Sequence, residues 1–492
     1  MLNIIIELSK YLILILIALY TLESFTVFKY EDDYDKRYIL RKQLLLIVFM
    51  DFTAFLVIFL KEEKLEIVYL FGALLLYLVV VQGLYRLCYK KASILLLNHM
   101  CMLLSIGFIM LARLSPDSAK RQFIIVAAAT VIAMIVPILI KKMYFLKMWT
   151  WFYAAAGLGL LLVVLIFGAN VNGAKININL GSFVFQPSEF VKIIFVFFVA
   201  SRLYKKSAQF KDHVITTIVA AVHVLVLVLS RDLGSAVVFF ITYVVMLYVA
   251  TKKPVYLVAG LGSGALAAIV AYFLFSHVQQ RVIAWKAPFS VYESSGYQIV
   301  QGLFAIGAGG WFGMGLCQGS PEMIPFVKQD YMFAAICEEL GGLFAICMIL
   351  ICMSMFLLVV NISLRIKKRF YKLIALGLGT EYAFQVFLTI GGVSKFIPMT
   401  GITLPLVSYG GSSALSTIIM LAIIQGLYIL REDEEEDIER RKEQQLRAQK
   451  NQTRRQETTG RRKSPQDTQR TTIKRRSTAG EKKNEREKDA AR

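Results

Sequence analysis

The sequence is divided into apolar runs of about 20 residues, and no other feature limits its fold as strongly. A helix needs about 20 mostly apolar residues to cross the hydrocarbon core of a membrane. With 57% hydrophobic and 18% charged residues among 492, the chain is too apolar for a soluble protein. We predict an all-α polytopic membrane protein with twelve or thirteen transmembrane helices. The predicted spans are residues 3–24, 42–61, 65–87, 93–114, 121–140, 148–169, 187–204, 213–229, 232–251, 255–275, 330–361, 371–392 and 405–430.

Basic residues cluster in every second connection between these runs. Lys and Arg are enriched in the cytoplasmic loops of membrane proteins, so we predict that these connections and the C-terminal tail are cytoplasmic and that the N-terminus lies outside. One outer connection carries Arg113, Lys120 and Arg121 and interrupts the alternation. Because the net charge of +21 resides in short loops and the tail, we expect no nucleic-acid partner.

Cysteine and histidine residues are scattered singly. The six cysteines form no CxxC pair and no cluster with the four histidines, so the sequence predicts neither a zinc site nor a disulfide framework. We expect the histidines to be structural. Residues 431–492 are rich in charge and poor in apolar side chains, which predicts a largely disordered tail whose first part, 431–450, extends the last helix.

Two polar regions lie at or inside the predicted spans, where ionisable groups are costly. In the first, Glu189 and Lys192 share one helix face and can neutralise each other. An orienting ion pair and the polar wall of a cavity are both open interpretations. In the second, Asp232 begins a span, where the helix dipole and a capping role explain it.

A third polar region is the long outer loop, residues 276–329, which contains Arg281, Lys286 and Gln298 and then a run of glycines. So many glycines predict backbone that bends sharply and approaches another group closely. The run is not a nucleotide-binding Walker loop, because no Gly-Lys-Ser/Thr sequence follows it.

The fourth polar region precedes the last span. Ser408, Ser412 and Ser413, together with neighbouring glycines, can offer N–H and O–H donors to an anionic group such as a pyrophosphate. A break between two helices is the alternative explanation. Taken alone, the four regions indicate a transporter or a membrane enzyme that acts at its outer face.

Seven ordered sequence blocks resemble the SEDS family, which is typified by FtsW, RodA and SpoVE. The resemblance covers about residues 93–430. The blocks are Phe185-Gln186-Pro187-Ser188-Glu189, Arg231-Asp232-Leu233-Gly234, His277 through Arg281, Gly296-Tyr297-Gln298, Ala305 through Gly310, Asp330-Tyr331-Met332-Phe333 with Glu338-Glu339-Leu340-Gly341, and Pro398 through Ser413.

The resemblance implies a ten-helix core at residues 91–430, preceded by an N-terminal transmembrane extension at residues 1–90 and followed by the charged tail. It also implies a multi-pass protein of the bacterial cytoplasmic membrane that polymerises lipid II at the outer face during division or elongation. A class B penicillin-binding protein is the expected crosslinking partner, in contact with the enzyme among membrane lipids.

Asp330 matches the aspartate that is essential in the family, and Glu189 and Lys192 match residues that line the family's central cavity. We expect Asp330 to be the general base that accepts the proton of the attacking hydroxyl. The pyrophosphate leaving group needs positive charge, which Arg281, Lys286 and Lys328, or a divalent cation such as Mg²⁺ or Mn²⁺, can supply. The chain departs from the family pattern at Ile176-Asn177, Arg231 and Lys328-Gln329, around the expected substrate contacts.

Three alternatives compete with this hypothesis. Asp330 is also well placed to cap the helix that follows it, because Asp is among the best N-cap residues. A flippase or transporter for a lipid-linked precursor needs polar groups such as Glu189 and Lys192 inside the bundle. A non-catalytic scaffold that recruits wall enzymes through its tail or its additional helices has the same hydropathy.

Overall fold

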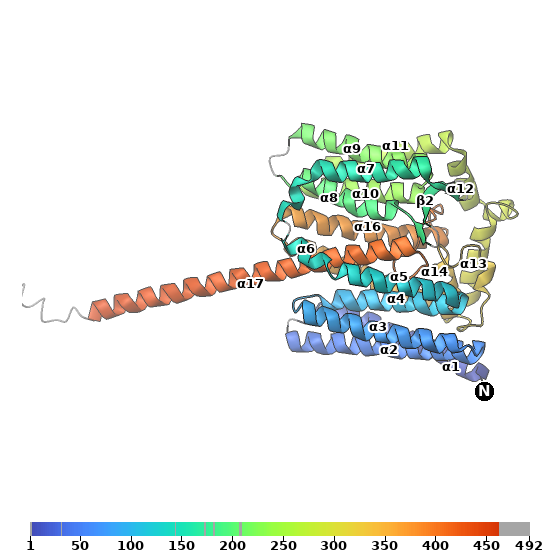
Figure 1. The fold of residues 1–492 in the computed structure, drawn as a ribbon, viewed down its shortest axis with the longest axis horizontal. Helices are drawn as coiled ribbons and strands as arrows, with labels where there is room; N and C mark the ends of the chain where they lie inside the picture. Colours follow the sequence, from blue (N-terminus) through green and yellow to red (C-terminus); the bar gives the residue numbers. More distant parts are fainter. Residues whose placement is uncertain are drawn as a thin grey trace, which may run out of the picture. The chain divides into compact units, whose positions relative to one another are not determined.

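A computed structural model of the chain describes residues 2–30, 32–142, 144–171, 174–180, 183–205 and 209–461. The chain divides into two compact units, Met1–Arg431 and Glu432–Arg492. In the first unit the helices lie side by side, and the short elements α12, α13 and α14 gather at the same end as the N-terminus (Figure 1). Outside the first unit, the described part of the chain is helical to Arg461.

The long helices carry most of the chain. The first three are α1 (Leu2–Thr26), α2 (Asp33–Glu62) and α3 (Leu65–Cys88), followed by α4 (Ile94–Leu114), α5 (Pro116–Ala133), α6 (Val136–Lys142) and α7 (Thr150–Phe167). The remaining long helices are α8 (Ser188–Leu203), α9 (Phe210–Leu229), α10 (Leu233–Thr251), α11 (Pro254–Leu274), α15 (Gly342–Arg365), α16 (Arg369–Val393) and α17 (Gly411–Arg461).

Three strands and three short α-helices lie in connections at the end of the bundle that holds the N-terminus (Figure 1). An antiparallel sheet of order β1-β2-β3 is formed by β1 (Ala169–Val171), β2 (Ala174–Leu180) and β3 (Phe183–Phe185). The helices are α12 (Ser276–Lys286), α13 (Tyr297–Gly309) and α14 (Met332–Leu340). The sheet was not predicted, and the long outer loop contains regular helices.

Twelve helices among the described residues are long and apolar enough to cross a membrane, in agreement with the predicted all-α polytopic fold. The predicted span 187–204 is the helix α8, but its 16 residues extend only about 24 Å, less than the roughly 30 Å of the hydrocarbon core. Its polar N-terminal turn is therefore recessed below the membrane surface if its other end reaches the opposite surface.

Two predicted spans have wrong boundaries. Residues 330–361 are not one helix, because α14 ends at Leu340 and Gly341 adopts a φ of +92° before α15 begins. The last span begins at Gly411 rather than at residue 405, since residues 405–409 form a turn and a bend. At the first break glycine relieves the steric cost of leaving the helix, whereas the second contains a non-glycine residue, Leu406, at a φ of +67°.

The helices α1–α3 pack on α4 and α15 and belong to the same compact unit as the rest of residues 1–431. Buried hydrogen bonds join them to the bundle. His99 on α4 is bonded through Nδ1 to the Tyr20 hydroxyl at 2.9 Å and through Nε2 to Ser354 on α15 at 3.0 Å. Asn98 bonds to Gln43 on α2 at 3.0 Å, and Gln82 on α3 donates to Asn98 at 2.8 Å. His99 is thus structural, as expected.

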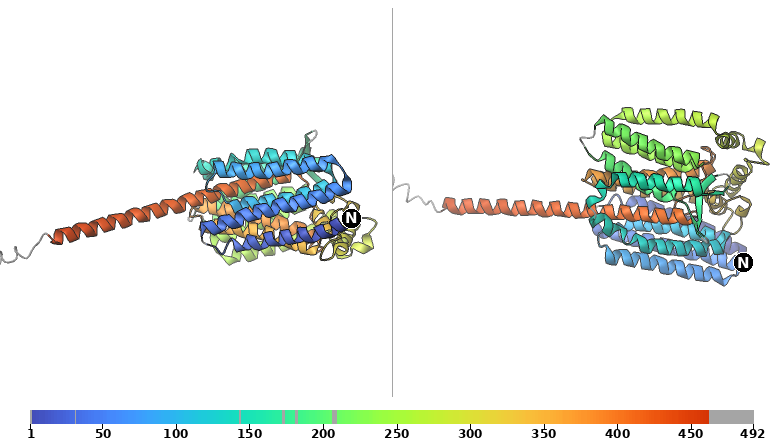
Figure 2. Two further views of the ribbon diagram at one scale, coloured as in Figure 1. Left: turned by 90° about the horizontal axis from the view of Figure 1, so that it is seen from below. Right: turned by 45° about the horizontal axis from the view of Figure 1, so that its top comes forward.

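The helices α1–α3 lie along one edge of the bundle in Figure 1, and the view from below in Figure 2 brings them to the front. Figure 1 places α9 and α11 at the opposite edge. The helices α8, α10 and α16 lie between these two edges, and α12 and α14 lie at the end of the bundle (Figure 1).

The glycine-rich segment after α13 approaches the backbone between α14 and α15. Gly313, at a φ of +78°, would place a Cβ atom 2.3 Å from the Glu339 carbonyl oxygen, and Gly309 would place one 1.9 Å from that of Cys337. The backbone amides of Met314 and Gly315 donate to the carbonyls of Glu338 and Glu339, both at 2.9 Å. The close approach predicted from the glycines is therefore to the protein's own chain.

Candidate functional site

Asp330 lies at the end of the long outer loop, two residues before α14. Its side chain does not cap that helix, because the N-cap position is Tyr331 and no side-chain capping bond forms. Oδ1 is buried without a hydrogen-bond partner among the described residues. Burial raises the pKa of Asp330 to about 6, although its own backbone amide and the charge of Arg281 act to lower it.

Arg281 on α12 connects the outer loop to the turn before α17 by hydrogen bonds. Its Nη1 donates to the carbonyl oxygens of Met399 at 3.2 Å and Thr400 at 3.0 Å. Burial lowers the pKa of Arg281, and the carboxylates of Asp232 and Asp330 oppose this effect. The guanidinium is thus a half-buried cation within the electrostatic reach of two carboxylates that come from separate parts of the sequence.

Asp232 connects this cation to the beginning of α8. Its Oδ1 accepts from the Ser235 amide at 3.1 Å, which is the predicted helix cap, and its Oδ2 accepts from the Ser188 hydroxyl at 3.0 Å. Gln186 donates through Nε2 to the same Ser188 hydroxyl at 3.2 Å. The capping explanation for Asp232 is correct but incomplete, since one carboxylate oxygen binds a second helix.

Glu189 and Lys192 form a buried ion pair in the next turn of α8. Lys192 Nζ lies 2.6 Å from Glu189 Oε2, and the two side chains are 5% and 7% exposed. Lys192 also donates to Gln385 Oε1 on α16 at 2.8 Å, and the Ser416 hydroxyl on α17 donates to Glu189 at 2.9 Å. Three helices therefore meet at one charged pair, so both earlier interpretations, an orienting pair and a polar wall, fit the geometry.

Glu381 belongs to the same buried cluster. Both of its carboxylate oxygens are buried without a hydrogen-bond partner among the described residues, and the charges of Lys192 and Glu189 act on it. Glu381 therefore lies within electrostatic reach of the Glu189–Lys192 pair but does not hydrogen-bond to Lys192. We name Glu189, Lys192, Glu381, Gln385 and Ser416 the buried polar cluster.

The three predicted serines hold the turn before α17 in place. The Ser412 hydroxyl accepts from the Gln186 amide at 3.0 Å and donates to the Val184 carbonyl at 3.1 Å. Ser413 accepts from the Thr403 hydroxyl at 3.0 Å, and Ser408 accepts from the Leu404 amide at 3.1 Å. Their hydroxyls are thus engaged with the protein, and the turn is the breakpoint between helices that the sequence left open.

The other predicted residues of the outer loop are spread around Asp330. Lys328 donates to the Ser118 hydroxyl on α5 at 3.3 Å, and Gln298 donates to the Pro325 carbonyl at 3.1 Å. Lys286 is exposed at the last residue of α12. Lys328 and Gln298 bind the loop to its surroundings, whereas Lys286 is open to an external group.

Arg113 is neutralised inside the protein. Its Nε donates to Glu339 Oε1 at 3.0 Å, and its Nη2 lies 3.6 Å from Glu322 Oε2. A paired arginine contributes little free charge, which accounts for its place in a connection that the charge alternation predicts to be outer.

The described residues contain no group of three or more His, Cys, Asp or Glu side chains that could hold a metal ion. Asp232 and Asp330 are two carboxylates near one cation, and Arg281 provides that positive charge. These residues do not fit a resident divalent cation, because the positive charge between the carboxylates is already that of Arg281.

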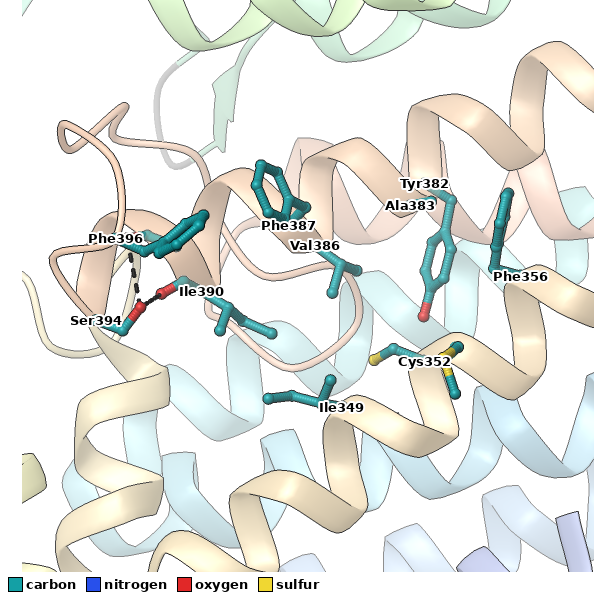
Figure 3. Close-up of a pocket in the computed structure, with 12 residues that line it drawn as sticks. Ile349, Cys352, Phe356, Tyr382, Ala383, Val386, Phe387, Ile390, Ser394 and Phe396 are labelled. Carbon is teal, nitrogen blue, oxygen red and sulfur yellow. Dashed lines mark hydrogen bonds between the residues drawn. The ribbon is translucent and has the colours of Figure 1, made fainter. Parts of the chain in front are cut away.

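An apolar groove lies on the surface between α15 and α16, separate from the polar site (Figure 3). It has a volume of about 360 Å³. Its lining includes Ile349 and Cys352 on α15 and Val386 and Phe387 on α16, and it ends at Phe396. That end belongs to the turn whose later residues bind Arg281.

Sequence reasoning missed Glu381, Gln385 and Ser416 and assigned Asp232 only a capping role. Glu381 gave a usable signal, because a lone carboxylate inside an apolar span is costly and marks a functional or paired position. Gln385 and Ser416 gave none, since uncharged polar residues are common inside membrane helices.

The chain was compared with known proteins. Residues 87–432 match the family FtsW/RodA/SpoVE, described as "Cell cycle protein". A RodA of Mycobacterium tuberculosis, named peptidoglycan glycosyltransferase, is 39% identical over 274 residues, which cover 51% of this chain and 57% of that protein. The chain thus spans little more than half the length of this relative. A protein of Saccharophagus degradans named "Probable peptidoglycan glycosyltransferase FtsW" is 31% identical over 72% of this chain and 96% of its own length.

Two solved structures share the fold. One comes from a study of how a peptidoglycan synthase complex coordinates polymerization and crosslinking; it is 25% identical, with a TM-score of 0.60, and covers 69% of this chain and 98% of its own. The other is RodA of Thermus thermophilus, 23% identical with a TM-score of 0.54 over 70% of this chain and 98% of its own. The family match, which covers most of the chain and includes every residue of the site from Arg113 to Ser416, shows that this protein is a member of the FtsW/RodA/SpoVE family.

Proposed function

We propose that this protein is a peptidoglycan glycosyltransferase that polymerises lipid II at the outer face of the bacterial cytoplasmic membrane. The observation that carries the proposal is Asp330, whose Oδ1 atom is buried without a hydrogen-bond partner among the described residues and whose carboxylate is within electrostatic reach of Arg281. Its pKa near 6 leaves it mostly ionised at neutral pH yet basic enough to accept a proton. The names of the RodA and FtsW relatives support the same activity.

In the proposed reaction, the 4-hydroxyl oxygen of one disaccharide attacks the anomeric carbon of another. The new carbon–oxygen bond forms as the bond from that carbon to the pyrophosphate breaks, and undecaprenyl pyrophosphate leaves with the electron pair. Asp330 takes the hydroxyl proton. Arg281 supplies positive charge near the developing anion, and a half-buried guanidinium does so more effectively than a fully exposed one because the local dielectric is lower.

The buried polar cluster has a supporting role in this proposal. Glu189 and Lys192 form a buried ion pair one turn along α8 from Ser188, and Ser188 connects this helix to Asp232. Lys286 is the exposed cation available to a pyrophosphate, and Ser408, Ser412, Ser413, Gln298 and Lys328 shape the surrounding loops. A divalent cation, if required, would accompany the pyrophosphate of the substrate.

Purified protein reconstituted with lipid II tests this proposal directly. We expect glycan polymer on a gel in the absence of any other polymerase. Movement of lipid II across vesicles without polymer would favour a flippase, and the absence of both would favour a scaffold. A second arm adds a class B penicillin-binding protein, the proposed partner, which should co-purify with this chain.

We propose that α12–α14 face outward and that the tail is cytoplasmic, because Lys367 and other basic residues lie in the connections opposite the outer loop. In a cysteine-free background, Ser294→Cys should react with a membrane-impermeant thiol reagent added to intact cells. Lys367→Cys and Gln445→Cys should react only after the membrane is permeabilised. Labelling of Gln445→Cys in intact cells would show that the orientation is opposite to the one proposed. All three positions are exposed.

A further inference from the structure

The N-terminal helices lie outside the region that matches the family, which begins at residue 87. They are nonetheless fixed to the bundle by the buried hydrogen bonds of His99, Tyr20 and Ser354. A further bond runs from the Ser354 hydroxyl to the Ser24 carbonyl at 3.3 Å. The α1 helix is therefore held against both α4 and α15.

The outer end of α1 contacts the glycine-rich segment of the outer loop. Ile6 is 1% exposed, and its Cγ2 atom lies 3.3 Å from the position of a Cβ atom on Gly315. Five residues further along α1, the centroid of the Tyr11 ring lies 5.8 Å from the centroid of the Phe312 ring, and the two rings are tilted relative to each other. Aromatic pairs of this geometry are favourable.

The opposite side of that segment is bound to the beginning of α15 and to α14. Gly342 and Leu343 donate their amides to the carbonyls of Gly310 at 2.8 Å and Trp311 at 3.1 Å. The side chain of Glu338 accepts from the Ser320 amide at 2.8 Å, and Arg113 joins Glu339 to the Gly319 carbonyl. Residues 310–320 thus lie between α1 and the helix that Asp330 precedes.

We infer that α1 positions the Asp330 turn, with Ile6 and Tyr11 as positioning residues that act through residues 310–320. On this inference, α1 restrains the conformation of the outer loop in addition to packing on the core. This inference rests on the proposed function for its effect on catalysis. The structural part, that α1 restrains residues 310–330, stands independently.

Hydrogen exchange in the full-length protein tests the restraint. In Tyr11→Ala, amides of residues 310–330 should exchange about threefold to tenfold faster, the size expected when one aromatic pair is lost. Phe312→Ala should do the same, and the double variant should add little because the two rings act through one contact. Tyr11→Phe retains the ring and should restore parental exchange. Tyr69→Ala, at an exposed tyrosine of α3, is the matched control and should have no effect.

Lipid II polymerisation provides the second measurement. A loosened turn exposes Asp330, which lowers its pKa toward the ordinary value near 4. Tyr11→Ala should therefore reduce kcat with little change in KM and move the acid limb of the pH profile to lower pH. Unchanged hydrogen exchange at residues 310–330 in both Tyr11→Ala and Ile6→Ala would contradict the inference that α1 restrains this segment. An inactive parent protein with the expected exchange would instead contradict the proposed function alone.

Discussion

Asp330→Asn should reduce glycan synthesis by roughly two to four orders of magnitude, the usual contribution of a general base. Asparagine retains the size of the side chain but removes the negative charge and the capacity to take up the hydroxyl proton. Among the described residues Asp330 neither caps α14 nor hydrogen-bonds through Oδ1, and its own backbone amide, which acts on the carboxylate, can equally donate to the side-chain oxygen of asparagine. The variant should therefore melt like the parent, and the decrease in activity will report on chemistry.

The pH profile of the parent protein provides an independent check. The pKa of Asp330 is raised to about 6 by burial, and only the ionised carboxylate can accept a proton. Activity should therefore be present above about pH 6 and should be lost as the pH falls through this value. An acid limb near pH 4 would mean that the titrating carboxylate is an exposed one.

Asp117→Asn is the matched control, since Asp117 is an exposed carboxylate whose partner, Lys120, lies 3.4 Å away. It should retain full activity. If well-folded Asp330→Asn polymerises lipid II at close to the parental rate, Asp330 is not the base, and the flippase and scaffold hypotheses gain support.

Lys192→Met should have the largest effect on stability, with a loss of about 3–5 kcal/mol in the free energy of unfolding. Lys192 is the cation that Glu189 binds at 2.6 Å and whose charge acts on Glu381. Removing it leaves the buried carboxylate of Glu189 without its counter-charge. Glu189→Gln should cost less, because Lys192 keeps its hydrogen bond to Gln385. Denaturation in detergent measures both.

Lys120→Met is the control for this experiment. Its ion pair with Glu66 is 2.8 Å long, but both side chains are about half exposed, and such pairs contribute only about 0–1 kcal/mol. The double variant Glu189→Gln/Lys192→Met should be more stable than Lys192→Met, because the negative charge of Glu189 that Lys192→Met leaves unpaired is also removed. Parental stability in Lys192→Met would show that the cluster is not held together by this cation.

The sequence by itself determined the membrane class of the protein and the positions of most helices, because a run of about 20 apolar residues has few stable alternatives to a membrane helix. It also determined Glu189 and Lys192 as a pair, since a spacing of three places both on one helix face. The alternation of Ile176, Ile178 and Leu180 with polar residues was a readable signal for β2, although that strand was not predicted.

Tertiary structure alone decided which distant residues meet. Arg281 reaches the carbonyls of Met399 and Thr400, and Lys192 reaches Gln385, through contacts that depend on helix packing rather than on local spacing. The same is true of α1 against the glycine-rich segment. Hydropathy determines that a segment enters the membrane, but the neighbours of a helix are chosen by side-chain packing and by the pairing of buried polar groups across helices.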